Sequence, residues 1–274
     1  MTVYGFIGAG NMAGAIVRGA ITAGMPAASI LVTSAHDSAD RLARATGARQ
    51  MEAAELVEAS DVVVLAVKPH VVPTVLTSLS SVLSQRLPLV LSIAAGVSTQ
   101  RLGELLPPGV RVVRAMPNMA AAVGRSMTAL TAGASATQAD LDAARALMVA
   151  VGRTQVLAER DFSAFTALAG SSPAFVFQFI EALARGGVAA GIPKAQAVEI
   201  ITQAVLGAAL TVQAAQMAQA DGERGRTPAD LIDAVCSPGG TTVAGLVALE
   251  RAGFSPAVIA GVEAIIARDR ELSA

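Results

Sequence analysis

The stretch Val3-Tyr4-Gly5-Phe6-Ile7-Gly8-Ala9-Gly10-Asn11-Met12-Ala13-Gly14 decides the fold class of this chain. An apolar run ends at Gly8, and residues 11–23 then carry the apolar spacing of a helix. Gly8 allows a tight turn, Gly10 lets the backbone approach a pyrophosphate, and Ala13 keeps the helix close to the strand. The N–H groups at the start of such a helix face an anion. The stretch therefore predicts a dinucleotide-binding turn made by Phe6, Ile7, Gly8, Ala9, Gly10, Asn11 and Met12.

Short β-rich runs alternate with helical patterns over the first half of the chain, which predicts a parallel sheet. The expected strands are Val3–Ile7, Ile30–Thr33, Val62–Val67, Leu89–Ile93, Val110–Ala115 and Met127–Thr131. The expected helices between them are Asn11–Ala23, Ser38–Thr46, Val71–Ser84, Thr99–Leu105 and Gln138–Val151.

The strand patterns stop near Glu159, and helical patterns fill the rest of the chain. Breaks are expected at Gly170–Pro173, Gly191–Pro193, Asp221–Thr227 and Ser237–Gly240. We therefore predict an α/β fold with two domains: a Rossmann-type NAD(P)-binding sheet over residues 1–159 and an all-helical domain over residues 160–274.

Composition narrows the class of protein. The 274 residues carry a net charge of −1 with both signs interspersed, which indicates neither a nucleic-acid partner nor an anionic membrane surface. One cysteine, Cys236, excludes a disulfide framework and fits a reducing compartment. The chain enters a strand at once, without the pattern of a signal peptide, so we expect a cytoplasmic protein.

Two long uncharged stretches, Phe162–Ile180 and Ile200–Ala220, approach the length of a membrane span. The first contains Gly170-Ser171-Ser172-Pro173 and the second contains four glutamines, so buried helices explain them better. Between residues 162 and 220, 59 residues hold only four charges. Because helices that are apolar nearly all round need to be covered, we expect this half of the chain to form a subunit interface.

The end of the second strand selects the cofactor. NAD-binding folds usually place an acid there to hold the ribose 2′-hydroxyl, whereas this strand ends Thr33-Ser34-Ala35-His36. Ser34 and His36 can donate to a 2′-phosphate, and Arg41 is within sequence reach. Asp37 argues mildly for NADH, although it is better explained as a helix cap. We predict NADPH, with NADH left open.

Two further strands end in residues suited to a ligand at the carboxyl edge of the sheet. Ala66 and Val67 end the third strand and Lys68 and Pro69 follow it, where Lys68 offers a cation near the cofactor or a substrate carboxylate. Ala94, Ala95 and Gly96 follow the fourth strand, and their small size allows the backbone to approach the nicotinamide ribose. His70 is either a general acid or, by the simpler interpretation, a histidine that caps a helix.

The segment Ser237-Pro238-Gly239-Gly240-Thr241-Thr242 opens a helix late in the chain. Glycine N–H groups, two threonine hydroxyls and the helix dipole converge there, which predicts an anion site. By itself the segment is equally compatible with a helix–helix turn capped by threonine.

Together these motifs resemble the pyrroline-5-carboxylate reductase family. Matching segments, in order, are Gly8–Met12, Val67–His70, Ala94–Val97, Gly170–Ala174 and Ser237–Thr242, and the similarity continues to Arg270-Glu271-Leu272. The resemblance implies hydride transfer from NAD(P)H to L-1-pyrroline-5-carboxylate, which gives L-proline in the last step of proline biosynthesis. It also implies a homodimer built by C-terminal helices, often grouped into rings.

The resemblance assigns roles to individual residues. Thr242 and Lys68 are the predicted catalytic residues, and no metal is expected. Reduction of a cyclic imine that arrives protonated needs no strong protein base, which agrees with a helical half poor in titratable groups. Catalysis would then rest on proximity, orientation and a preorganised anion site. The predicted substrate-binding residues are Glu159, Ser237, Gly239, Gly240, Thr241 and Thr242.

Two alternatives stay open at this point. A related oxidoreductase of the 3-hydroxy-acid dehydrogenase kind would need a catalytic lysine in the helical domain, where Lys194 occupies an expected loop. A regulatory protein that binds NADP without turnover would need neither Thr242 nor Lys68.

Overall fold

The computed structural model describes residues 1–220 and 225–273 of the chain. By compactness the chain divides into two units, Met1–Gly170 with the last part of the C-terminal helix from Ile265, and Ser171–Ala264. This division lies beyond the predicted border at residue 159, because Phe162 and Phe165 are buried with Ala129 of the sheet. The expected break at Asp221–Thr227 falls partly outside the described residues.

The first unit is built on an eight-stranded sheet in the order β3-β2-β1-β4-β5-β6-β7-β8. Its strands are β1 (Tyr4–Ile7), β2 (Ile30–Thr33), β3 (Arg49–Gln50), β4 (Val62–Leu65), β5 (Leu89–Ser92), β6 (Arg111–Met116), β7 (Ser126–Ala132) and β8 (Gly152–Val156). The Rossmann-type sheet predicted from the sequence is confirmed, with one correction. β7 runs antiparallel to β6, because the segment between them holds only the short 3₁₀ helix η3 (Met119–Val123) and no crossover helix.

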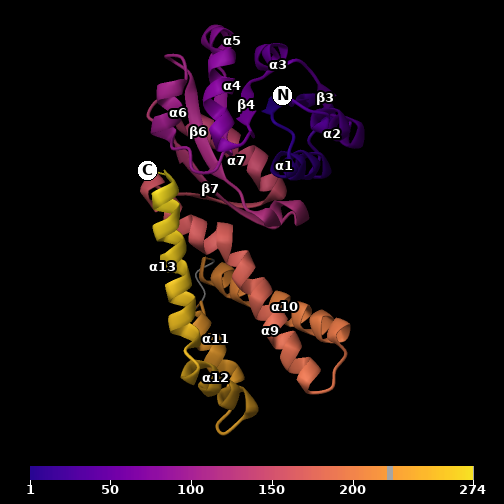
Figure 1. The fold of residues 1–274 in the computed structure, drawn as a ribbon, viewed down its shortest axis with the longest axis vertical. Helices are drawn as coiled ribbons and strands as arrows, with labels where there is room; N and C mark the ends of the chain where they lie inside the picture. The colour runs from indigo at the N-terminus through magenta and orange to yellow at the C-terminus, as the bar shows by residue number, and fades with distance from the viewer. Residues whose placement is uncertain (221–224, 274) are drawn as a thin grey trace. The chain divides into compact units, whose positions relative to one another are not determined.

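Strand residues alternate between the two apolar cores. Phe6, Val32 and Val64 belong to the core that also holds α1 (Asn11–Thr22), α2 (Ser38–Thr46) and α7 (Gln138–Met148). Ile7, Leu31 and Val63 belong to the opposite core, to which four further helices contribute buried residues (Figure 1). These helices are α3 (Ala53–Ala59), α4 (Val72–Ser78), α5 (Ser80–Arg86) and α6 (Thr99–Leu105). Period-two alternation in strands buried on both faces explains their continuous apolar runs.

Several elements differ from the expectation. The helix expected at Val71–Ser84 is divided into η2 (Pro69–Val71), α4 and α5, and the one expected at Gln138–Val151 ends as α7 followed by η4 (Val149–Val151). Strands β3 and β8 and helix α3 were not predicted. β3 and most of β8 expose polar side chains, so the apolar periodicity that marks the other strands is missing there.

The second unit is helical. Its helices are α9 (Ser172–Ala189), α10 (Lys194–Ala220), α11 (Pro228–Val235), α12 (Thr241–Arg251) and most of α13 (Phe254–Ser273). The expected break at Gly170–Pro173 is wrong: after η5 (Glu159–Asp161) and α8 (Phe162–Phe165), the π-helical segment η6 (Thr166–Ser171) leads directly into α9. Pro173 lies in the first turn of α9 and has no N–H to donate to the preceding helical turn. The carbonyl of Ala169, four residues earlier, accepts from the side chain of Asn118 at 2.9 Å instead.

Two helical segments are long and apolar enough to cross a membrane by length and composition alone, Glu159–Ala189 and Lys194–Gln219. Only 11% and 6% of their most apolar windows are buried within the chain. The bent pair α12 and α13 would add a third if it were one span. These apolar surfaces need a cover that the described part of a single chain does not supply.

Candidate functional site

The turn after β1 is shaped by Gly8. Gly8 has a φ of +104°, and a Cβ atom added there would lie 2.5 Å from the carbonyl oxygen of Ala66. Its N–H donates to the carbonyl of Thr33 at 2.9 Å, while the N–H of Ala66 donates to the carbonyl of Ile7 at 2.8 Å. The turn therefore lies against the ends of both neighbouring strands, and only glycine fits there.

The next glycine leaves space on its outer side. Gly10 is the N-cap residue of α1 and has no side chain to cap the first N–H groups of the helix. A Cβ atom at Gly10 would meet no protein atom within 4 Å. Since the protein itself does not require glycine here, a ligand against this backbone is the better explanation, and the open N–H groups suit an anion.

A groove of about 330 Å³ adjoins this turn. Arg18 of α1 and Arg41 of α2 lie on its border, and the guanidinium of Arg18 folds back over Gly14. The glycine turn and two arginine side chains therefore border the same groove. Its lining residues are Ala9, Gly10, Asn11, Gly14, Arg18, Ser38, Arg41, Leu42 and Ala45.

Ser34, predicted to contact a 2′-phosphate, is engaged within its own loop. Its hydroxyl donates to the carbonyl of His36 at 2.5 Å and accepts from the N–H of Ala39 at 2.9 Å. Ser38 also donates to it at 2.9 Å. Asp37 occupies the N-cap position of α2 but makes no capping bond, so Ser34 caps this helix in place of Asp37. His36 is exposed.

The two other predicted loops lie side by side at the same edge of the sheet. The N–H of Ile93, just after β5, donates to the carbonyl of Leu65 at the end of β4. Ala94 is buried, whereas Ala95 and Gly96 are exposed, with Gly96 at a φ of +73°. Ala66 and Val67 are half-buried, and Lys68, Pro69 and His70 are exposed on η2 and just before it. The loops predicted to bind the cofactor therefore follow four neighbouring parallel strands, β2, β1, β4 and β5, at one edge of the sheet.

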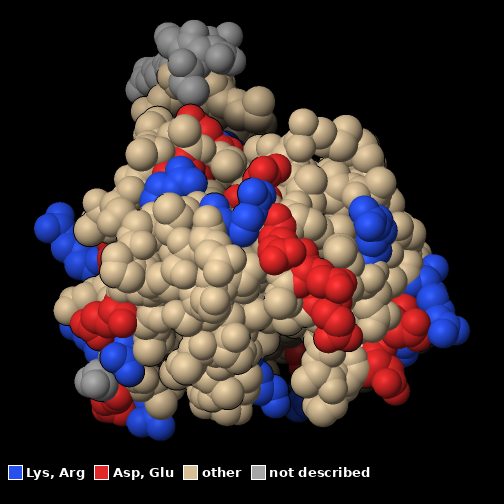
Figure 2. All heavy atoms as spheres, turned by 90° about the horizontal axis from the view of Figure 1, so that it is seen from above, with Lys and Arg blue, Asp and Glu red and all other residues tan. Residues whose placement is uncertain are grey.

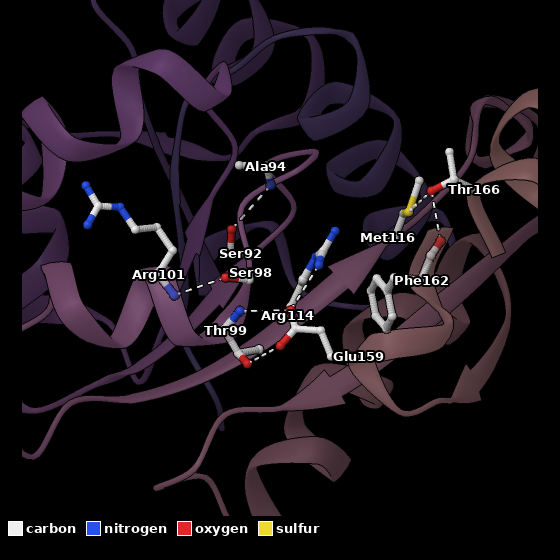
Figure 3. A network of polar contacts seen from close by, with 10 residues as sticks. All are labelled: Ser92, Ala94, Ser98, Thr99, Arg101, Arg114, Met116, Glu159, Phe162 and Thr166. Carbon is white, nitrogen blue, oxygen red and sulfur yellow. Dashed lines mark hydrogen bonds and ion pairs between the residues drawn. The ribbon is translucent and has the colours of Figure 1, made fainter. Parts of the chain in front are cut away.

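The carboxylate of Glu159, which was predicted to bind substrate, accepts hydrogen bonds from protein donors in the first unit (Figure 3). One carboxylate oxygen accepts from the N–H of Thr99 at 2.8 Å and from Arg114 at 2.9 Å, and the other accepts from the Thr99 hydroxyl. Arg114 is 8% exposed, and its guanidinium lies 4.4 Å from the centroid of the Phe162 ring. We call Thr99, Arg114 and Glu159 the Glu159 network.

The pKa of Glu159 is lowered from its ordinary value. Burial alone would raise this pKa, but the hydrogen bonds from the side chain and backbone of Thr99, together with Arg114, outweigh burial. The carboxylate is thus held charged. Arg114 and Thr99 lie 45 and 60 residues away along the chain, so no local pattern marks them as its partners.

The predicted anion nest, Ser237–Thr242, lies in the second unit. Gly239 has a φ of +69°, and the N–H of Gly240 donates to the carbonyl of Ser237 at 3.0 Å, which closes the turn. Gly240 is the N-cap residue of α12 and makes no side-chain capping bond. The exposed Thr241 and Thr242 follow as the first two residues of α12, so this end of an eleven-residue helix carries both its first N–H groups and two threonine side chains.

The side chain of Lys194 is engaged in an ion pair, whereas a catalytic lysine would have to be available to the substrate. Its ammonium is 2.5 Å from a carboxylate oxygen of Glu181, which also pairs with Arg185 at 2.8 Å. Hydrogen bonds from Lys194 and Arg185 lower the pKa of Glu181. Among the described residues, no group of three or more histidines, cysteines or acids could hold a metal ion.

Comparison with known proteins finds similarity to one enzyme family over nearly the whole chain. Residues 159–272 match the family model for pyrroline-5-carboxylate reductase dimerisation, and residues 3–96 match that for NADP oxidoreductase, coenzyme F420-dependent. A pyrroline-5-carboxylate reductase of Arabidopsis thaliana is 40% identical over 98% of this chain and 95% of its own length. The chain belongs to the pyrroline-5-carboxylate reductase family.

Solved structures of the family agree with this membership. The fold is similar to that of a pyrroline-5-carboxylate reductase from Coxiella burnetii, with a TM-score of 0.90, 34% identity and coverage of 100% and 99% of the two chains. It is also similar to the Plasmodium falciparum pyrroline carboxylate reductase with NADP bound, with a TM-score of 0.85, 25% identity and coverage of 100% and 98%. The family resemblance predicted from the sequence is confirmed.

Proposed function

We propose that this chain reduces L-1-pyrroline-5-carboxylate to L-proline with NAD(P)H, the last step of proline biosynthesis. The observation that carries the proposal is the 40% identity to a pyrroline-5-carboxylate reductase over nearly the full length of both chains. A similarity restricted to the sheet would have supported no more than a nucleotide-binding fold.

The cofactor would be held by the loops after β1, β2, β4 and β5. Gly10 supports this assignment because the space beside its backbone is open while the neighbouring Gly8 is enclosed by protein. The N–H groups at the start of α1 would bind the pyrophosphate, and the small residues Ala94–Gly96 would lie against the nicotinamide ribose. When bound, the cofactor supplies the hydride. The turn also contains Phe6, Ile7, Ala9, Asn11 and Met12, and the loop after β4 contains Ala66, Val67 and Pro69.

NADPH is the favoured form of the cofactor. β2 ends at Thr33 without an acid at its tip, since Asp37 follows only at the start of α2, and Arg41 and Arg18 border the groove beside the glycine turn. A 2′-phosphate there would gain two charge-assisted contacts that NADH lacks. Because the Ser34 hydroxyl already bonds inside its loop, we assign the main part of this preference to Arg41.

The substrate carboxylate would dock on the anion nest at Ser237–Thr242. The exposed hydroxyl of Thr242 and the N–H groups at the start of α12 provide donors that need no titratable group. Such donors fix the orientation of the ring and stabilise its charge without a protein base, since the imine nitrogen arrives protonated. Thr242 would also reach the ring nitrogen, and Lys68 would add a positive charge at the edge of the sheet.

The family's dimerisation domain supports a homo-oligomer. We propose a homodimer, with grouping of dimers into a ring as its extension, because the helices of the second unit leave large apolar side chains exposed. In the cytoplasm, a second copy of the chain would cover these surfaces in place of a membrane. Basic and acidic side chains are interspersed over the face in Figure 2, where they form no broad basic area of the kind nucleic acids bind.

The test is the oxidation of NADPH by the purified chain with pyrroline-5-carboxylate, followed by absorbance and repeated with NADH. We expect turnover with both cofactors, a higher kcat/KM with NADPH, and proline as the product. Binding of NADPH without oxidation would instead support a regulator that does not catalyse. Turnover of a 3-hydroxy acid with no turnover of the imine would support the dehydrogenase alternative, which the pairing of Lys194 with Glu181 disfavours.

A further inference from the structure

The loop between β5 and α6 is held by hydrogen bonds at both ends (Figure 3), and its middle is exposed. At its start, the N–H of Ala94 donates to the Ser92 hydroxyl at 3.3 Å, and Ile93 bonds to Leu65. At its end, Thr99 donates both its N–H and its hydroxyl to Glu159. Between these anchors, Ala95 and Gly96 are exposed. The second anchor at this end is the Ser98 hydroxyl, which caps α6 by accepting from the N–H of Arg101 at 3.1 Å. One anchor of this short loop is therefore a carboxylate that lies 60 residues further along the chain.

Glu159 is itself held rigidly. Arg114 of β6 donates to it at 2.9 Å, and the guanidinium of the buried Arg114 lies over the ring of Phe162. Phe162 is 2% exposed and belongs to a core with Ala129 of β7. A guanidinium that lies over an aromatic ring and bonds to a carboxylate has little freedom. The rigid sheet thus determines the position of Thr99 through Arg114 and Glu159.

We infer that Glu159 is a positioning residue for cofactor binding: through Thr99, its carboxylate holds the Ala94–Gly96 loop in the conformation that receives the nicotinamide ribose. This inference rests on the proposed function for the identity of the ligand. The three hydrogen bonds that its two carboxylate oxygens accept from protein donors favour this role over direct contact between Glu159 and the substrate. Glu159 touches none of the reacting atoms in this role.

The test compares Glu159→Gln with a matched pair at its partner, Thr99→Val and Thr99→Ser. Gln keeps the size of Glu159 but loses the charge, Val removes the Thr99 hydroxyl at similar volume, and Ser restores it. Glu104→Gln is the control, because Glu104 also pairs with an arginine, Arg101 at 3.0 Å, but is half exposed on the far end of α6. Hydrogen exchange over residues 93–100 of the full chain without cofactor is measured alongside Kd for NADPH by calorimetry.

We expect Glu159→Gln to speed exchange in this loop and to raise Kd for NADPH about tenfold, the size of effect typical for a lost bond to a charged group. Thr99→Val should have a smaller effect of the same kind, and Thr99→Ser and Glu104→Gln should match the wild type. KM for pyrroline-5-carboxylate should change less than KM for NADPH.

Unchanged exchange and unchanged Kd in Glu159→Gln would overturn the inference. A rise in KM for pyrroline-5-carboxylate alone would also overturn it, in favour of direct substrate contact. The exchange and binding measurements need no turnover. If the wild type bound NADPH but failed to reduce the imine, the proposed function would fall while the positioning role would still be decided. Should Glu159→Gln fail to fold, the comparison of Thr99→Val with Thr99→Ser tests the same positioning role: equal exchange and equal Kd in these two variants would overturn it.

Discussion

The two units of the chain bury their apolar side chains to very different extents. In the first unit, strand residues such as Phe6, Leu31 and Val64 are at most 1% exposed. In the described part of the second unit, only Ala184 and Ala197 are buried apolar residues. The first unit therefore contains a complete apolar core. The second unit instead exposes apolar helix surfaces of the kind that subunit interfaces bury. The apolar faces of the sheet are covered by helices of the same chain, whereas we expect the helices of the second unit to be covered by a second copy of the chain.

The largest effect is expected from a charge placed on the apolar helices. Leu206 is 50% exposed on α10, and Leu206→Asp would bury an unpaired carboxylate if a second chain covers it. Leaving a buried charge unpaired costs roughly 3–5 kcal/mol. We expect loss of the oligomer and of nearly all activity, measured by light scattering and NADPH oxidation. Val123→Asp, at a 74% exposed apolar residue of the first unit, is the control and should keep both. An active oligomer of Leu206→Asp would remove α10 from the interface.

Gly10→Val should abolish cofactor binding while both units stay folded. A Cβ atom at Gly10 meets no protein atom within 4 Å, so the substitution leaves room on the protein side, but the branched side chain would occupy the place proposed for the pyrophosphate. Calorimetry with NADPH measures the loss, and circular dichroism checks the fold. Wild-type affinity in this variant would show that the phosphate site lies elsewhere.

Thr242→Ala should lower kcat/KM for pyrroline-5-carboxylate without changing Kd for NADPH. It removes a hydrogen bond to a charged group, worth about 1.5–3 kcal/mol, or roughly ten- to a hundredfold. Thr242→Ser keeps the hydroxyl and should retain most of the activity. Equal kcat/KM for wild type and Thr242→Ala would argue against the anion nest as the substrate site.

A smaller effect is expected on cofactor preference. Arg41→Gln removes a cation from the groove beside the glycine turn, so KM for NADPH should rise several-fold while KM for NADH stays nearly constant. Arg44→Gln is the control, because Arg44 pairs with Asp40 on the same helix and does not line the groove. An equal rise for both cofactors would mean that Arg41 does not contact the 2′-phosphate.

The smallest effect concerns acid stability. Because the folded state lowers the pKa of Glu159, its charge stabilises the fold above the ordinary glutamate pKa of 4.5, and this contribution shrinks as the pH falls below that value. The difference in Tm between wild type and Glu159→Gln should therefore be full at pH 7 and diminish toward pH 3.5 in thermal melts. A difference that is independent of pH would mean that the charge of Glu159 adds nothing to stability.

The sequence predicted those elements whose apolar spacing is strong. Ile30–Thr33, Ser38–Thr46 and Thr99–Leu105 have the predicted bounds, since each joins a clear pattern to a cap or turn residue. β3 was missed because Arg49 and Gln50 are exposed and polar. The direction of β7 depends on the connection that precedes it, which apolar spacing does not encode.

The candidate site was predictable wherever its residues lie together along the chain. The glycine turn and the segment Ser237–Thr242 each form a local pattern, and the structure gives both the predicted turn-to-helix geometry. The Glu159 network had no such pattern, because Thr99, Arg114 and Glu159 meet only when the sheet has formed. Arg18, which borders the groove beside the glycine turn, was not predicted either, since a single cation on a helix has no distinctive spacing.

Sedimentation velocity of the wild-type chain over a dilution series, with specific activity measured on the same samples, tests the contrast between the two units most directly. We predict at least a dimer at micromolar concentration, and a joint loss of assembly, activity and thermal stability on dilution, because a free monomer would expose its apolar helices. A stable, fully active monomer at every concentration would contradict the account.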